Sequence, residues 1–97
     1  MYVHPIDYAE LRKHAAAVEA KYPIKILGVL PRGSVGHLLA VTGVDLLAEM
    51  RPGLSLLTLA GAEIELGELI QRPVGIVLVG GLRGDYGDRV KASVRPF

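Results

Sequence analysis

The stretch Ile24-Lys25-Ile26-Leu27-Gly28-Val29-Leu30 is followed by a glycine-rich break and then by Val44-Asp45-Leu46-Leu47-Ala48-Glu49-Met50. The first run is apolar and rich in β-branched residues, which predicts a strand over residues 24–30. The second run alternates with period 2, which predicts a strand over residues 44–50 with Asp45, Leu47 and Glu49 on one face. A carboxylate that is buried without a partner costs several kcal/mol. We therefore expect Asp45 to be partly exposed, at a sheet edge, a strand mouth or a site.

Composition limits the class of protein. The chain has 97 residues, of which 51% are hydrophobic and 5% aromatic, so we expect a single domain over residues 1–97 with an aliphatic core. The formal charge of +1 gives no electrostatic case for nucleic acid as a main partner. Cysteine is absent, which excludes disulfides and thiolate metal sites. No apolar run approaches the length of a membrane span, so we expect no membrane partner and a soluble, cytoplasmic protein.

Two helices flank these strands in the sequence. The first begins after the N-cap Asp7 and ends before Pro23, with Glu19 among the residues assigned mostly to its outer side. Its apolar face contains Tyr8, Leu11, Ala15, Val18 and Tyr22. The second helix begins after the cap Ser55 and ends before Pro73. Its apolar face contains Leu59, Ala62, Leu66, Leu69 and Ile70.

The C-terminal part of the chain completes a mixed fold. Residues 74–79 predict a third strand, which we expect to be central because both of its faces are apolar. Residues 85–93 predict a short helix, and residues 94–97 an edge strand in which Pro96 is tolerated. The sequence thus predicts an α/β (α+β) fold with a small mixed sheet of three to four strands and helices packed on it.

The segment between the first two strands has two interpretations. Gly33 and Ser34 lie in a glycine-rich turn that resembles a phosphate-binding loop, but the Gly-Lys-Ser/Thr ending of such loops is missing. The alternative is an ordinary glycine turn. The three histidines, His4, His14 and His37, are scattered and do not have the spacing of metal ligands.

The order of elements and several short phrases resemble the minimal nucleotidyltransferase family, whose fold is polymerase-β-like. The resemblance covers nearly the whole chain without gaps and rests on five phrases: Val44–Glu49, Pro52–Leu56, Glu63–Leu69, Arg72–Val74 and Asp88–Val90. It implies a nucleotidyltransferase-like fold.

The resemblance also implies a site. The family uses three carboxylates on neighbouring strands: two hold paired Mg²⁺ ions, which neutralise the nucleoside triphosphate, and the third completes the site near the nucleophile. Asp45 is the matching catalytic and metal-binding residue. Gly33 and Ser34 are the candidate phosphate-binding residues, although this pair comes two residues after Pro31 and Arg32, which stand at the family's Gly-Ser positions. Gly43 and Gly75 stand where the other two carboxylates belong, and we expect both to converge with Asp45 on one side of the sheet. The chain is therefore interpreted as a degenerate member, and Glu49 lies too far along its strand, at roughly 13 Å, to act as a substitute.

Three functions follow from this comparison. The first is a nucleotidyltransferase-fold protein whose transfer activity is degraded or absent, acting with a helical HEPN-type partner in a toxin–antitoxin-like pair. The second is an active metal-dependent enzyme that moves a nucleoside monophosphate from a nucleoside triphosphate to an acceptor. The third is a homodimeric binding module. The candidate contact surfaces are His37–Val41 and the strand edge near Phe97.

Overall fold

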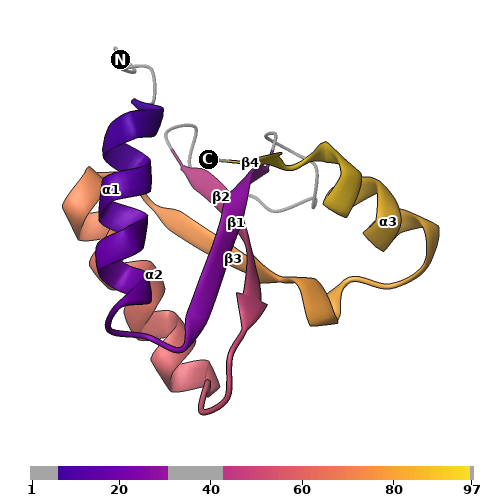
Figure 1. Ribbon diagram of the computed structural model, residues 1–97, viewed down its shortest axis with the longest axis horizontal. Helices are drawn as coiled ribbons and strands as arrows, with labels where there is room; N and C mark the ends of the chain where they lie inside the picture. Colours follow the sequence, from indigo (N-terminus) through magenta and orange to yellow (C-terminus); the bar gives the residue numbers. More distant parts are fainter. Residues whose placement is uncertain (1–6, 31–42, 97) are drawn as a thin grey trace.

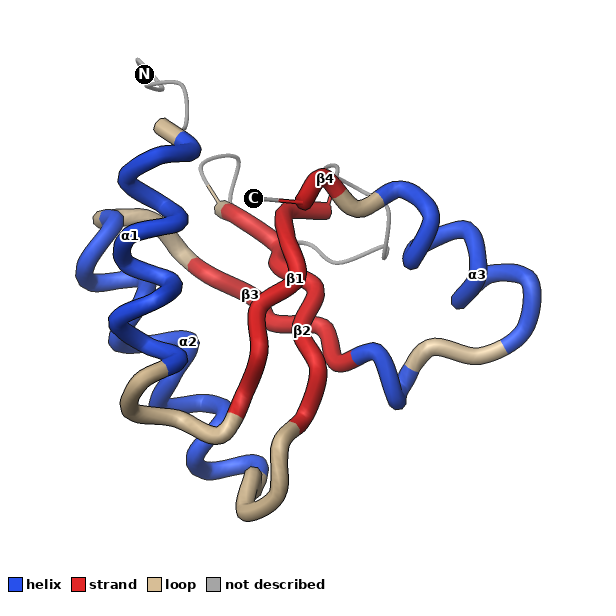
Figure 2. Tube along the Cα trace, viewed as in Figure 1, coloured by secondary structure: helices blue, strands red, loops and turns tan. Residues whose placement is uncertain are grey.

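The computed structural model describes residues 7–30 and 43–96 and shows helices on both sides of a small sheet (Figure 1). The elements are α1 (Tyr8–Glu19), β1 (Ile24–Leu30), β2 (Val44–Met50), α2 (Leu56–Ile70), β3 (Val74–Leu78), η1 (Val79–Gly81), α3 (Gly84–Ser93) and β4 (Arg95–Pro96). In Figure 2, α1 and α2 lie side by side next to one face of the sheet, and α3 lies toward the other face. The predicted mixed α/β fold is confirmed.

The sheet has the order β3-β2-β1-β4. β1 runs antiparallel to both β2 and β4, whereas β2 and β3 are parallel. The expectation that the third strand is central is wrong, because β3 forms one edge. Its residues are apolar on both faces since both faces are covered. Val74, Ile76 and Leu78 pack toward α1 and α2, and Val77 packs toward α3.

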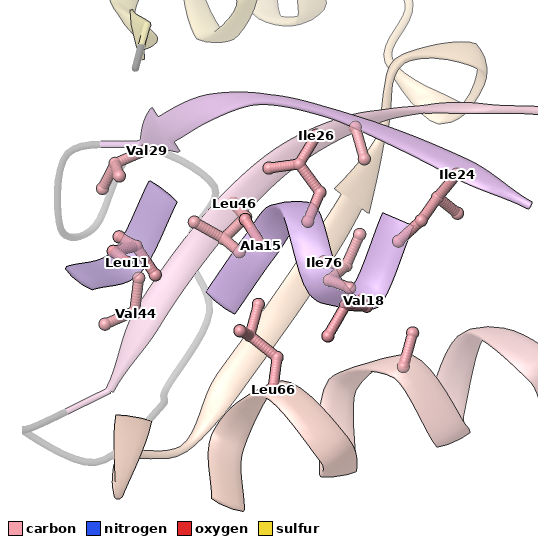
Figure 3. Close-up of a cluster of buried hydrophobic side chains, with 12 residues drawn as sticks. Leu11, Ala15, Val18, Ile24, Ile26, Val29, Val44, Leu46, Leu66 and Ile76 are labelled. Carbon is pink, nitrogen blue, oxygen red and sulfur yellow. The ribbon is translucent and has the colours of Figure 1, made fainter. Parts of the chain in front are cut away.

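The main core lies between the sheet and the α1–α2 layer (Figure 3). Its twelve buried residues come from two helices and three strands: Leu11, Ala15, Val18, Ile24, Ile26, Val29, Val44, Leu46, Ala48, Ala62, Leu66 and Ile76. A smaller cluster on the opposite face joins Leu30 and Leu47 to Val90 of α3. The sheet is therefore covered on both faces, with most of the burial on the α1–α2 side.

α1 begins and packs largely as its sequence predicts. Asp7 is the N-cap, and its Oδ1 accepts hydrogen bonds from the backbone N–H groups of Ala9 at 3.0 Å and Glu10 at 3.2 Å. Tyr8 was assigned to the apolar face but is exposed. It stands in the first turn, one turn before the first buried residue, Leu11.

α2 begins at the predicted cap, where the backbone N–H of Thr58 donates to Ser55 Oγ at 3.1 Å. Ala62 and Leu66 of its predicted apolar face are buried. Leu69 is exposed, contrary to its assignment, because it stands in the last turn of the helix.

Two glutamates tie the helices to the strands. Glu19 Oε2 accepts a hydrogen bond from the backbone N–H of Ile26 at 2.9 Å, and Glu63 Oε2 accepts one from the N–H of Ile76 at 2.8 Å. The assignment of Glu19 to the outer side of α1 is therefore wrong. Because β3 is an edge strand, the Glu63 carboxylate also blocks part of an open hydrogen-bonding edge.

The other edge depends on a glycine in β1. The register of β1 against β2 shifts between Ile26 and Gly28. Gly28 then pairs with Pro96 of β4, and a Cβ at residue 28 would collide with the Arg95 carbonyl oxygen and come within 2.8 Å of Pro96 Cα. Only glycine allows β4 to approach this closely. Pro96 is tolerated there because β4 is an edge strand, as predicted.

Candidate functional site

Asp45 lies near the start of β2, between two neighbouring strands. Its register partners are Leu30 on β1 and Gly75 on β3. The alternation that places Leu47 in the smaller cluster puts Asp45 on the same, α3-side face of the sheet.

The side chain of Asp45 is buried, at 8% relative exposure. The expectation of partial exposure is wrong. That expectation assumed a lone buried carboxylate, whereas Asp45 takes part in an interaction within the structure. Such an interaction offsets part of the cost of removing the charge from water.

Gly75 and Gly43 stand where the resemblance to minimal nucleotidyltransferases places the other two carboxylates. Gly75 is the direct partner of Asp45 in the parallel β2–β3 pair, so the two backbones run about 4.8 Å apart there. Gly43 stands two residues before Asp45, immediately ahead of β2. In extended backbone this spacing returns a side chain to the same face. Side chains at positions 43, 45 and 75 would meet near the first residues of β2 and β3. Positions 43 and 75 are glycines, so Asp45 alone has a side chain there.

The other acidic residue on this face of β2 is remote from Asp45. Glu49 is exposed near the opposite end of the strand, where its register partner is Lys25. Four residues along a strand place it roughly 13 Å from Asp45. Glu49 therefore cannot share a metal ion with Asp45.

The described residues do not fit a two-magnesium centre. Within residues 7–30 and 43–96, no three or more His, Cys, Asp or Glu side chains are grouped to hold a metal ion. Two Mg²⁺ ions require several oxygen ligands, and Asp45 supplies a single carboxylate. Gly33 and Ser34, the predicted phosphate-binding residues, lie outside the described residues, as do His37–Val41 and Phe97.

Ionic contacts away from Asp45 lie on the helices and in the connection between α1 and β1. His14 Nε2 lies 3.4 Å from Glu10 Oε2 on the preceding turn of α1. Lys21 Nζ lies 2.9 Å from Glu65 Oε1, and the Tyr22 hydroxyl donates to the same oxygen at 3.3 Å. The hydrogen bond and charge of Glu65 raise the pKa of Lys21 above its ordinary value of 10.5. The contacts of Lys21 and Tyr22 with Glu65 join the α1–β1 connection to α2 and are structural.

The sequence did not reveal the role of two polar residues, Glu19 and Glu63, which bind helices to strands of the sheet. Each lies in a helix as an ordinary surface-type residue, and each binds a backbone N–H of a neighbouring strand. No local sequence pattern marks such a contact, because it depends on where the helix crosses the strand.

The chain runs α1-β1-β2-α2-β3, with a parallel β2–β3 pair and an aspartate near the start of β2, which is consistent with a nucleotidyltransferase-like fold. The structure is similar to a solved one described as "Structure of putative minimal nucleotidyltransferase", with a TM-score of 0.70 and 25% sequence identity. The match covers 95% of this chain and 97% of the other. It confirms the resemblance drawn from the sequence.

The remaining comparisons give no match. No protein-family model and no curated protein matches this sequence. No helix in the described part of the chain is long and apolar enough to cross a membrane.

Proposed function

We propose that this is a nucleotidyltransferase-fold protein whose nucleotidyl-transfer activity is degraded or absent, and that it acts with a helical HEPN-type partner in a toxin–antitoxin-like pair. The observation that carries the first half of the proposal is the register of β2 against β3, which sets Asp45 beside Gly75. A glycine at that place leaves one carboxylate where in-line transfer assisted by two metal ions needs several.

The partner half of the proposal rests on the resemblance to minimal nucleotidyltransferases. The similarity in fold over 95% of the chain supports that resemblance. In such a pair, this protein would act by binding and not by chemistry. Neutralisation of the partner would then be independent of Asp45.

A transfer assay tests the chemical half. The purified protein is incubated with each radiolabelled nucleoside triphosphate, Mg²⁺ or Mn²⁺, and candidate acceptors that include a HEPN-type protein. Asp45→Asn is the test variant, and Glu49→Gln is its matched control because it removes an exposed carboxylate from the same strand. We expect no transfer above background by any of the three proteins. Transfer that is lost in Asp45→Asn and kept in Glu49→Gln would overturn the proposal and establish an active enzyme.

Binding and neutralisation test the partner half. The protein and a HEPN-type protein are co-expressed, and complex formation is followed by sedimentation while cell growth reports toxicity. We expect Asp45→Asn to rescue growth as well as the parent protein does. A partner that is neither bound nor neutralised would reject the pairing, and a dimer of the protein alone would favour a homodimeric binding module.

A further inference from the structure

The outer edge of β3 is open beyond the point where Glu63 closes it. The Val44 N–H of β2 donates to the Pro73 carbonyl at 2.9 Å, and this bond sets the alternation of the parallel β2–β3 pair. By that alternation, Ile76 and Leu78 direct their backbone N–H and C=O groups away from β2. The Ile76 N–H donates to Glu63. The Ile76 carbonyl and the Leu78 N–H have no hydrogen-bond partner among the residues that the structure describes.

An apolar hollow of about 390 Å³ adjoins these two backbone groups. Leu59 of α2 lines the hollow on one face of the sheet and packs against the main core. Leu82 and Tyr86 line it on the other face, where Leu82 packs against the smaller cluster. Gly81 lines it as well, and a Cβ at that residue would meet nothing within 4 Å. The open part of the edge therefore lies between apolar walls on both faces, with free space beside it.

Unpaired backbone groups at a sheet edge select an extended chain as their partner. The Ile76 carbonyl and the Leu78 N–H flank Val77. A strand laid beside Val77 can therefore donate an N–H to the carbonyl and accept the N–H through one of its own C=O groups. Because side chains alternate along such a strand, the one opposite Val77 would lie on the face of Leu82. The side chains on either side of it would lie on the face of Leu59.

A second copy of this chain does not fit the edge. If two β3 strands paired antiparallel around Ile76, each Glu63 carboxylate would occupy a position that the other strand needs, and the two like charges would repel. If they paired around Leu78, each strand would have to pair with η1 (Val79–Gly81) of the other copy, which is helical and not extended. The occupant that fits is therefore an extended segment of another protein.

We propose that β3 binds a short extended segment of a partner protein as an added strand. The Ile76 carbonyl and the Leu78 N–H form the hydrogen bonds, and apolar side chains of the segment fill the hollow. Glu63 fixes where the added strand begins, because it already occupies the Ile76 N–H. The binding requires neither Asp45 nor a metal ion, so it holds or fails separately from the function proposed above.

Titration with a synthetic peptide tests the proposal. The probe is a short peptide of central valines flanked by threonines, with a lysine at each end for solubility, and a second version carries N-methyl groups on the central valines. Amide NMR spectra and hydrogen exchange of the isotope-labelled protein report binding. We expect the first peptide to shift the Leu78 amide saturably and to slow its exchange. The exchange of the Ile76 amide should change little, because Glu63 already binds it. The N-methylated peptide lacks the donors and should not bind.

A pair of glycine variants locates the contact. Gly81→Leu should weaken binding about tenfold or more, because its side chain fills the hollow. Gly80→Leu is the matched control, since Gly80 does not line the hollow and should bind the peptide as the parent does. At both residues a Cβ meets nothing within 4 Å and φ is not positive, so both variants are compatible with the fold. Thermal melts establish that each is folded.

A pair of tyrosine variants tests the wall of the hollow. Tyr86→Ala removes part of the wall and should weaken binding. Tyr8→Ala is the control, because Tyr8 lies on α1 and is 45% exposed, close to the 47% of Tyr86. The proposal is wrong if the Leu78 amide shows no saturable response, if both peptides bind equally, or if Gly81→Leu binds as Gly80→Leu does. Protection of the Leu78 amide that rises with protein concentration alone would assign the edge to a second copy and would also overturn it.

Discussion

Restoring carboxylates beside Asp45 is the most direct test of the site. In the Gly43→Asp/Gly75→Asp variant, three carboxylates would lie near the first residues of β2 and β3. Two charges about 4.8 Å apart repel by about 3 kcal/mol at an effective dielectric constant of 20. The protein would relieve part of this by holding one carboxyl protonated. For a domain of this size, a loss of about 3 kcal/mol corresponds to a fall in melting temperature of roughly 12–24 °C.

Added magnesium should reverse part of that fall. A ligand that binds only the native state stabilises it by RT ln(1 + [L]/Kd), which is about 1.4 kcal/mol when magnesium is in tenfold excess over Kd. The melting temperature of the double variant should therefore rise by roughly 6–11 °C with the metal. The parent protein, which has one carboxylate at this place, should not respond.

The Gly43→Asn/Gly75→Asn variant is the matched control, because asparagine has the shape of aspartate without its charge. Thermal melts of the parent and both double variants, with and without magnesium, complete the experiment. The melting temperature of the double aspartate variant could rise no more with magnesium than that of the double asparagine variant. That result would show that positions 43, 45 and 75 do not converge. The assignment of the site around Asp45 would then be wrong.

Three further outcomes are expected from the scaffold. Gly28→Ala should lower stability by about 1–3 kcal/mol in chemical denaturation, because its methyl group collides with the backbone of β4. Gly80→Ala is the control, and it should change stability little because a Cβ at residue 80 meets nothing within 4 Å. Glu63→Ala should cost about 1.5–3 kcal/mol and speed hydrogen exchange of the β3 amide that it binds, and Glu63→Gln should recover most of that loss. The contribution of Lys21 is complete below its ordinary pKa of 10.5 and is lost as pH rises through its raised pKa. The difference in melting temperature between the parent and Lys21→Gln should thus be constant up to that pH and shrink above it.

The first two strands could be predicted because the neighbouring sequence marks where each strand ends and because their apolar patterns are strong. β1 and β2 span residues 24–30 and 44–50 as predicted. Within β1, however, strict alternation fails, since Ile26 and Val29 both face the main core. The shift in register between Ile26 and Gly28 allows this. Because Gly28 admits β4 at the same place, the irregularity follows from tertiary packing.

The position of β3 and the burial of Asp45 could not be predicted, for a related reason. An apolar strand indicates that its faces are covered, but it does not say how many strands lie beside it. β3 is covered on both faces and still forms an edge. The cost of burying Asp45 likewise depends on which groups the fold brings to it, and the sequence around Asp45 does not specify them.

α2 shows where a pattern can be correct and still incomplete. The predicted stripe contains both buried residues of the helix, Ala62 and Leu66. The same helix carries Leu57 and Ile64 outside that stripe, and a period of 3.6 residues cannot tell an apolar side that meets the sheet from one that meets another molecule. The structure separates the two sides, because the sheet covers one and leaves the other exposed. The exposed aliphatic side chains of α2 therefore had no distinguishing signal in the sequence.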